Sequence, residues 1–332
     1  MKIAIVFGGR SVEHEVSILT GLHAAKHVIE PHKLKLVYLT RKNKFVIGKR
    51  NLDFYMREHR GSKKLPKCLL SADVVLNCCH GGVGEGGSLA GMLGVLGISH
   101  TGCNSIVAAQ LMSKTMTRRI LCEFGFDQPK YNQSDIVFPV IIKPDKLGSS
   151  IGISIAKNKE ELKAAIELAL TLDENYIVEE YLQNATEINC SAFFYGDKVW
   201  TSKVQVMEKD EILSFDKKYL ENSGGFGKKG KLDSVEEHPL QNEIQRLTEE
   251  AYKLFGMSGV IRADFLVVED KIYLNEVNTV PGFLCYPMWI ASGVPYGVLI
   301  DMLVTQARDT KEPKLVTSYQ SNVLETNRVL VE

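Results

Sequence analysis

Two short segments near the C-terminus combine charged and amide side chains in a pattern typical of metal ligands. RADF places Arg262 and Asp264 two residues apart, and NEVN places Glu276 and Asn278 two residues apart. Side chains two apart on a β-strand point to the same face. Two carboxylates and an amide on one face need a cation, and hard oxygen ligands favour Mg²⁺. The pattern predicts a metal site. The alternative is a surface hairpin held by a salt bridge.

The strand that carries Glu276 and Asn278 is expected to be apolar along the rest of the same face. Ile272 and Leu274 precede Glu276 in steps of two, so all four side chains would point the same way. A polar end on an apolar face either meets a ligand or leaves the core for water, and these residues leave both open. The strand stops at the Pro-Gly pair 281–282.

The turn between the two strands decides whether the polar pairs meet. A three-residue turn of residues 269–271 would set Val268 opposite Ile272. In that register the polar pair of RADF lies opposite the polar pair of NEVN, with Asp264 against Glu276. A two-residue turn would place the pairs on opposite faces. We therefore expect the three-residue turn.

The segment IIKPDKLGSSIG is typical of a phosphate site. Lys143 ends an apolar strand, and Gly148, Ser149 and Ser150 follow in a turn. Backbone N–H groups and hydroxyls in such a turn hold phosphate oxygens, and a lysine adds a positive charge. The alternative is a polar hairpin without a ligand. The Walker spacing G-x-x-x-x-G-K-[ST] is absent.

Glycine-rich turns follow two of the N-terminal strands. GGRSVEHEVS could open a helix that binds an anion, although Glu13 and Glu15 would also complement the helix dipole without a ligand. The dinucleotide fingerprint G-x-G-x-x-G is absent. His14 is expected to be structural. His80 lies between a strand and a glycine turn, at the edge of a parallel sheet where ligands bind.

The segment VEEYLQNATE carries acids at the end of another apolar strand. Glu179 and Glu180 end the strand, the backbone near Leu182 could meet the edge of a flat base, and Glu187 could bind a ribose. The alternative is a solvated turn. The residues themselves do not decide between these interpretations.

The order of the expected elements predicts an α/β protein of three units. Strand, glycine turn and helix repeat over residues 1–103, which is typical of a parallel sheet. Residues 104–184 and 185–307 predict two smaller α+β units. The third unit contains SGGFGKKGK, whose composition favours a mobile loop. Residues 308–332 predict a polar tail.

The composition excludes several classes of protein. The chain has 332 residues, 45% hydrophobic and 24% charged, with a formal net charge of zero, which indicates neither nucleic acid nor a membrane as partner. Its seven cysteines form no CxxC pair, which favours reduced thiols in the cytoplasm. No apolar run reaches membrane-spanning length, and MKIAIVFGG reads as a first strand rather than a signal peptide.

Taken together, these segments resemble the D-alanine–D-alanine ligases of the ATP-grasp superfamily. The resemblance runs from residue 1 to about 306 and rests on FGGRSVEHEVS, HGGVGEGGS, IIKPDKLGSSIG, DKKYL, RADF and NEVNTVPGF. It implies an N-terminal Rossmann-like domain and two ATP-grasp subdomains with ATP between them. It also implies a homodimer.

The resemblance implies a role for each candidate residue. The implied ATP-binding residues are Lys114, Lys143, Ser150, Glu179, Glu180, Leu182, Glu187 and Lys218. The implied catalytic residues are Glu13, Ser149, Tyr219, Arg262 and Gly282. Two Mg²⁺ ions, with Mn²⁺ as an alternative, are implied on Asp264, Glu276 and Asn278. We further expect the substrate to lie near His80, Leu284 and Tyr286.

The implied reaction joins two D-alanines at the expense of ATP. Glu13 would receive the first ammonium group and, with Ser149 and Tyr219, form a hydrogen-bonded link. ATP would convert the first carboxylate to an acyl phosphate. The second amine would then attack, with Arg262 and the N–H of Gly282 at the oxyanion. DKKYLENSGGFGKKGK would be the lid that excludes water, with Lys218 reaching the γ-phosphate.

The chain departs from the family pattern in two loops. Gly86 stands where the family usually has an acid, in G-E-D-G. Only Leu284, Cys285 and Tyr286 separate PGF from Pro287, where the family usually has a longer stretch with a hydroxyl that binds the second carboxylate. D-Serine therefore stays open as the second substrate, because an apolar pocket rejects an added hydroxyl poorly.

Three further interpretations concern the function. The Lys218–Tyr219 pair favours an amine over a hydroxy-acid acceptor. A nucleotide-binding protein without ligase activity would not need the metal and phosphate residues. A dinucleotide-dependent oxidoreductase would need the missing glycine fingerprint.

Overall fold

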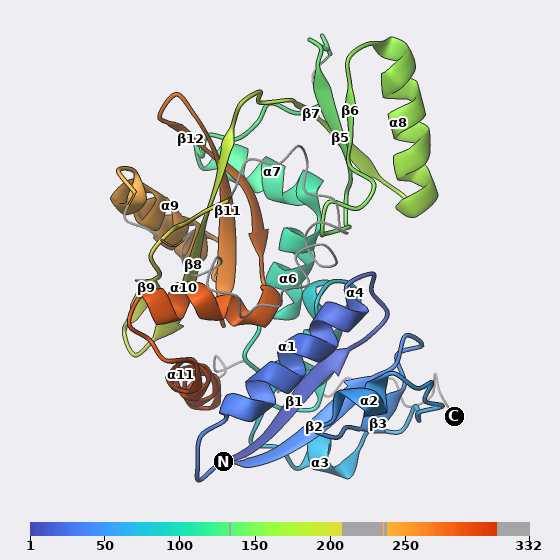
Figure 1. The fold of residues 1–332 in the computed structure, drawn as a ribbon, viewed down its shortest axis with the longest axis vertical. Coiled ribbons are helices and arrows are strands. Elements are labelled where there is room, and N and C mark those ends of the chain that lie inside the picture. Colours follow the sequence, from blue (N-terminus) through green and yellow to red (C-terminus); the bar gives the residue numbers. More distant parts are fainter. Residues whose placement is uncertain (133, 208–234, 236–237, 311–332) are drawn as a thin grey trace, which may run out of the picture.

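The computed structural model describes residues 1–132, 134–207, 235 and 238–310. The expected lid, with Lys218 and Tyr219, and residues 311–332 of the expected tail lie outside the described residues. Figure 1 shows an N-terminal sheet at the bottom, a small sheet with one helix at the top right and a third sheet on the left. The expected α/β class is confirmed. The domain boundaries themselves stay a prediction.

The N-terminal sheet has the order β3-β2-β1-β4. β1 pairs in parallel with β2 and β4, and β3 is antiparallel to β2. The side chains of Ile3 to Phe7 are at most 1% exposed, because both faces of β1 are covered. The elements of this part are β1 (Lys2–Gly8), α1 (His14–His27), β2 (Lys33–Leu39), β3 (Phe45–Ile47), α2 (Leu52–Tyr55), α3 (Lys67–Leu70), β4 (Val74–Asn77), α4 (Gly82–Glu85) and α5 (Ser88–Val95).

Two helices lead from this sheet to the next. They are α6 (Ser105–Met112) and α7 (Lys114–Glu123). Ser113 stands between them, and its hydroxyl accepts a hydrogen bond from the N–H of Met116 at 3.2 Å, so it caps α7. Helix α7 lies between the other two sheets (Figure 1), and Arg118 on this helix is 2% exposed.

The small central sheet is antiparallel, in the order β6-β5-β7, and α8 packs on it. Asn158 caps α8, because its Oδ1 accepts a hydrogen bond from Glu161 N at 2.9 Å, and the Glu161 carboxylate accepts one from Lys157 N at 2.8 Å. The elements are β5 (Val140–Pro144), β6 (Ser154–Ala156), α8 (Lys159–Leu172) and β7 (Tyr176–Glu180).

The third sheet has the order β10-β8-β11-β12, with β9 also paired to β8. Its last helices return to the N-terminal sheet: Met288, Trp289 and Leu299 share one buried core with Ile3 and Phe7. The elements are β8 (Thr186–Tyr195), β9 (Lys198–Thr201), β10 (Gln205–Val206), α9 (Gln241–Leu254), β11 (Ile261–Val268), β12 (Lys271–Asn278), η3 (Gly282–Cys285), α10 (Tyr286–Ala291) and α11 (Tyr296–Asp309).

Within the described ranges, we find no single helix with the length and apolar character needed to cross a membrane. One bent pair of helical segments, Gly282–Ala291 with Tyr296–Asp309, has this length and apolar character when the two are taken together.

Candidate active site

The β11–β12 hairpin has a two-residue turn, so the expected three-residue turn is wrong. Val268 pairs with Lys271 across Glu269 and Asp270, whose φ angles of 47° and 66° are left-handed. A two-residue turn with two positive φ angles matches the twist of the strands. By itself, this turn would put the polar pairs on opposite faces.

A β-bulge restores the register. Phe265 pairs with Leu274, but its neighbour Asp264 pairs with Glu276, so Asn275 is an extra residue on β12. As a result Asp264 lies opposite Glu276 and shares its face, as expected. Arg262 pairs with Asn278 in the same register.

The bulge also changes which residues of β12 share a face. Ile272 and Leu274 pair with Val267 and Phe265 and pack in the core, where Leu274 is 1% exposed. Glu276 and Asn278 lie on the other face. The expectation that all four side chains share one face is therefore wrong, because the extra residue reverses the alternation.

Asp264 is the centre of the polar face. Its carboxylate, 2% exposed, accepts hydrogen bonds from Arg262 Nε at 2.6 Å and Nη2 at 2.7 Å. Asn278 Nδ2 donates to it at 2.9 Å. The two carboxylates and one amide offer hard oxygen atoms on adjacent strands, which suits Mg²⁺. Among the described residues, no group of three or more His, Cys, Asp or Glu side chains is placed to hold a metal ion.

Glu13 and Ser149 join the N-terminal part to the central sheet. The Ser149 hydroxyl donates a short hydrogen bond to Glu13 Oε1. Ser149 and Ser150 both have left-handed φ, 55° and 58°, which shapes the turn after β5. Burial raises the pKa of Glu13, and the charge of Glu276 raises it further, while Arg262 opposes this. Glu13 also lies next to Gly148, since a Cβ atom there would be 3.2 Å from Glu13 Oε2, and Gly148 lines the same cleft as Glu276.

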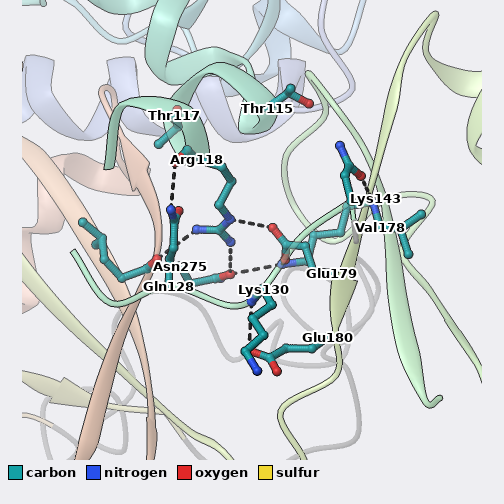
Figure 2. Close-up of polar contacts among 12 residues, drawn as sticks. Thr115, Thr117, Arg118, Gln128, Lys130, Lys143, Val178, Glu179, Glu180 and Asn275 are labelled. Carbon is teal, nitrogen blue, oxygen red and sulfur yellow. Dashed lines mark hydrogen bonds and ion pairs between the residues drawn. The ribbon is translucent and has the colours of Figure 1, made fainter. Parts of the chain in front are cut away.

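Three buried charged side chains, Arg118, Lys143 and Glu179, meet near Asn275 of β12 (Figure 2). Lys143 Nζ lies 2.7 Å from Glu179 Oε2 and donates to Asn275 Oδ1 at 3.0 Å. Arg118 donates to Glu179 Oε1 at 2.6 Å. Lys114 donates to the carbonyl oxygen of Leu147 at 2.5 Å, in the loop after β5. Sequence reasoning missed Arg118 and Asn275, since neither has a spacing that marks it.

Two clefts border these groups. The first is lined by residues of the phosphate segment and the hairpin, including Lys114, Gly148, Glu276 and Asn278. The second has a volume of about 280 Å³ and is lined by Val137, Phe138 and Val178 together with the two acids of VEEYL. Glu180 is held there, because its Oε1 accepts a hydrogen bond from the N–H of Lys130 at 2.8 Å. Leu182 and Glu187 follow directly and are half-buried.

Glu85 also lines the first cleft, and sequence reasoning missed it. Burial raises the pKa of Glu85 well above its ordinary value, and the charge of Glu13 adds to this. The position of this acid inside the glycine-rich turn GGVGEGGS is the sequence signal that could have identified Glu85. Its neighbour Gly86 has no room for a side chain, because a Cβ atom there would lie 2.6 Å from the carbonyl oxygen of Gly82.

His80 supports the Pro-Gly turn. Its Nδ1 lies 2.5 Å from the carbonyl oxygen of Val280, and its Nε2 lies 2.7 Å from Thr20 Oγ1. Thr20 Oγ1 in turn accepts a hydrogen bond from the N–H of Phe283 at 3.2 Å. Burial lowers the pKa of His80 to about 4, so the ring is neutral at pH 7. This arrangement fixes the backbone on both sides of Gly282.

The short stretch after this turn is buried rather than open. Phe283, Leu284 and Cys285 all have left-handed φ, between 50° and 55°, and Leu284 is 2% exposed in the core. The Tyr286 ring packs on the rings of His23 and Tyr296, with centroids 5.0 Å and 5.2 Å apart. Neither Leu284 nor Tyr286 lines the two clefts described above.

The fold and the site define a class of protein, the ATP-grasp enzymes: two antiparallel sheets meet across a buried lysine and a buried carboxylate, beside an N-terminal sheet whose central strands are parallel. Residues 2–103 match the family model described as D-ala D-ala ligase N-terminus, and residues 116–305 match D-ala D-ala ligase C-terminus. The chain belongs to the D-alanine–D-alanine ligase family.

Similar proteins span nearly the whole chain. The D-alanine–D-alanine ligase B of Clostridium tetani is 33% identical over 348 residues, covering 94% of both chains. The D-alanine–D-alanine ligase of Thermosipho melanesiensis is 29% identical, covering 98% of both. Among solved structures, the VanG D-Ala:D-Ser ligase of Enterococcus faecalis has a TM-score of 0.78 at 25% identity, covering 92% of this chain and 98% of its own. The Bacillus anthracis ligase complexed with ATP has a TM-score of 0.68 at 24% identity, covering 93% and 96%.

Proposed function

We propose that this chain is an ATP-dependent ligase that joins two D-alanines through D-alanyl phosphate and supplies D-alanyl-D-alanine for peptidoglycan. The observation that carries the proposal is the Glu13–Ser149 hydrogen bond, formed beside Lys114, Arg262 and Glu276. In this arrangement, a carboxylate that can bind an ammonium group lies next to cations that can bind phosphates. The family membership and the names of the similar proteins support the same conclusion.

The nucleotide would lie between the two antiparallel sheets. Lys114, Lys143 and Ser150 would bind the phosphates, because a buried and a half-buried lysine next to a turn of left-handed residues suit a polyanion. The apolar walls of the 280 Å³ cleft suit a flat base. Base and ribose would contact the residues of the VEEYL segment, Glu179, Glu180, Leu182 and Glu187.

The first D-alanine would bind with its ammonium group at Glu13. Its carboxylate oxygen attacks the γ-phosphorus, the bond to the β-phosphate oxygen breaks, and D-alanyl phosphate and ADP form. Such a transfer needs in-line positioning and charge neutralisation more than covalent catalysis. Lys114 and Lys143 supply positive charge for it, and Lys218 would add more from the segment outside the described residues.

The second D-alanine would then react through its amine. The amine attacks the carbonyl carbon of D-alanyl phosphate, a tetrahedral oxyanion forms, and phosphate leaves with its bonding electron pair. Arg262 and the N–H of Gly282 would stabilise the oxyanion. Both are held in place: Arg262 by Asp264, and the turn of Gly282 by His80 and Thr20. Tyr219 would complete the link with Ser149 and Glu13.

Asp264, Glu276 and Asn278 would hold two Mg²⁺ ions, or Mn²⁺ in their place. The donor set fits, because Asp264 and Glu276 face each other in register and Asn278 already contacts Asp264. When bound, the metal neutralises the charge that develops on the transferred phosphoryl group.

D-Serine as the second substrate is the alternative function. The buried three-residue stretch Phe283–Cys285 favours it, since it leaves no exposed side chain after the Pro-Gly turn to discriminate an added hydroxyl. The similarity to the VanG D-Ala:D-Ser ligase supports the same alternative. We also propose that the chain forms a homodimer and acts in the cytoplasm.

Phosphate release from Mg-ATP tests the function directly. D-Alanine, L-alanine, D-serine and D-lactate would each be supplied alone, and D-serine also together with D-alanine, with products identified by mass. We expect D-alanine-dependent release with D-alanyl-D-alanine as the product. A mixed dipeptide with D-serine as the preferred product would favour the alternative. No release with D-alanine, either alone or together with D-serine, would contradict both.

A further inference from the structure

Arg118 is a buried arginine next to the nucleotide site, and the reaction assigns it no role. It lies on α7 and is 2% exposed. Its guanidinium donates to Glu179 Oε1 at 2.6 Å, to the carbonyl oxygen of Leu274 at 2.9 Å and to Asn275 Oδ1 at 3.1 Å (Figure 2). Three acceptors on two different strands fix the plane of the guanidinium, so Arg118 cannot turn away without losing several bonds.

The β-bulge supplies two of those acceptors. Asn275 is the extra residue on β12, and Leu274 is the residue before it. A bulge redirects the side chain and the carbonyl next to it. The irregularity that sets Glu276 opposite Asp264 therefore also holds Arg118 against Glu179.

Glu179 is the carboxylate that Arg118 orients. It is 1% exposed, lies one residue before the end of β7 and lines the 280 Å³ cleft. Its two oxygens face Arg118 and Lys143, at 2.6 Å and 2.7 Å. Burial would raise the pKa of Glu179, but Arg118 and Lys143 lower it to about 2. An ionised carboxylate only accepts hydrogen bonds.

The two cations differ in what they do when a nucleotide binds. Lys143 is on a flexible stem and is expected to contact the phosphates, which weakens its ion pair with Glu179. Arg118 is bound by the hairpin and stays. Arg118 is then the counter-ion that keeps Glu179 in place while this carboxylate contacts the nucleotide base.

We propose that Arg118 is a positioning residue for selection of the nucleotide base. By fixing Glu179 as an acceptor at the cleft, it favours a purine with an amino group at C6 over one with a carbonyl at C6. The amino group donates to the carboxylate, whereas a carbonyl oxygen is repelled by it. This inference rests on the proposed function, in which Glu179 contacts the adenine.

The test compares ATP with ITP, which carries a carbonyl at C6, in initial rates of phosphate release with D-alanine. The variant is Arg118→Met, and the matched control is Arg119→Met, since Arg119 is the next residue on α7 and is exposed. We expect R118M to raise the KM for ATP and to lower the ATP-over-ITP ratio of kcat/KM about tenfold or more, as for loss of one hydrogen bond to a charged group. R119M should leave the ratio unchanged. An R118M enzyme with the wild-type ratio would overturn the proposal.

A second variant covers the case in which R118M does not fold, which thermal unfolding would reveal. Arg118→Lys keeps the charge but loses the planar fork, so we expect a smaller fall in the same ratio, compared with Arg119→Lys. An unchanged ratio in R118K would then overturn the proposal. A loss of stability alone would not change the preference between two bases.

Glu179→Gln separates this proposal from the proposed function. If the wild type releases no phosphate with either nucleotide, the ligase function fails, and thermal stabilisation by ATP and ITP then measures the ratio in its place. If the wild type is active and E179Q keeps the full preference for ATP, the contact between Glu179 and the base is absent and the Arg118 proposal fails while the ligase function stands.

Discussion

Asp264 and Glu276 lie opposite each other on β11 and β12 because one extra residue in β12 compensates for a turn of two residues. Without the bulge, the same turn would set Glu276 towards the core that contains Phe265 and Leu274. The candidate metal site therefore depends on how β12 accommodates this extra residue. This dependence can be tested by changing the length of the strand and not only its side chains.

Deletion of Asn275 should remove the bulge and keep the candidate metal site. Glu276 would then follow Leu274 directly, in the position opposite Asp264 and on the same face. Asn275→Ala keeps the chain length and serves as the control for loss of the side chain. We expect Mg-ATP to raise the melting temperature of both variants as it does that of the wild type. Loss of this stabilisation in the deletion variant alone would contradict the pairing of Asp264 with Glu276.

Asp264→Asn should reduce both metal dependence and activity. The substitution removes a charge that Arg262 and the metal would share. We expect the rate of phosphate release to fall about a hundredfold or more. We also expect that Mg²⁺ added with ATP no longer stabilises the variant. Asp270→Asn in the exposed turn is the control and should change neither. Release that continues after chelation of divalent cations would contradict the metal assignment.

Thr20→Val should slow the reaction with little effect on nucleotide binding. Valine has a similar shape but cannot bond His80 or the N–H of Phe283, so the backbone next to Gly282 loses a support. We expect kcat to fall about tenfold, as for a misplaced oxyanion donor, with an unchanged KM for ATP. Thr171→Val, at an exposed position on α8, is the control. A kcat equal to that of the wild type would exclude this supporting role.

His23 should make the protein less stable in acid. Burial lowers the pKa of His23 to about 4, whereas the unfolded chain has an ordinary histidine pKa near 6.5. The unfolded state therefore binds more protons between these values, and stability from this residue is lost as the pH falls from about 6.5 to about 4. His23→Phe keeps the aromatic packing without the charge. Urea unfolding would give the free energy of unfolding of H23F and of the wild type at both pH values. We expect the difference in favour of H23F to be about 1–3 kcal/mol larger at pH 4.5 than at pH 7. Parallel pH curves for the two proteins would refute this.

Gly86→Ala should destabilise the protein, because the new Cβ would lie 2.6 Å from the carbonyl oxygen of Gly82. Gly94→Ala is the matched control: no heavy atom lies within 4 Å of its Cβ, and it sits inside α5. We expect G86A to lower the free energy of unfolding by about 1–3 kcal/mol and G94A to raise it by up to about 1 kcal/mol. Melting temperatures that move in the same direction for both would contradict the steric explanation.

Much of the fold could be predicted, because its signals are local. Apolar runs such as residues 2–7 and glycine turns mark strand–turn–helix units, and the structure has the expected parallel sheet. The motif segments predicted the family, which the family models confirm. The register of Asp264 and Glu276 was also predicted, although from the wrong turn. A bulge leaves no local mark, since it depends on how two strands pair.

The residues that sequence reasoning missed act through long-range contacts. Arg118 meets Glu179 and Leu274, which lie 61 and 156 positions away along the chain. Its helical context predicts only an ordinary polar side chain. Glu85 becomes part of the site only because α4 packs its loop beside the hairpin residues of the first cleft. The roles of Lys218 and Tyr219 stay predictions, because both residues lie outside the described ranges.

The central claim is that ATP activates the first D-alanine as an acyl phosphate. D-Alanine labelled with ¹⁸O in its carboxylate would be incubated with Mg-ATP, and the released phosphate would be analysed by mass. Attack of the carboxylate on the γ-phosphorus transfers one labelled oxygen to phosphate for each D-alanyl-D-alanine formed, and this is the result we predict. Dipeptide formed together with unlabelled phosphate would contradict the account, because the carboxylate oxygen would then never have been bonded to phosphorus.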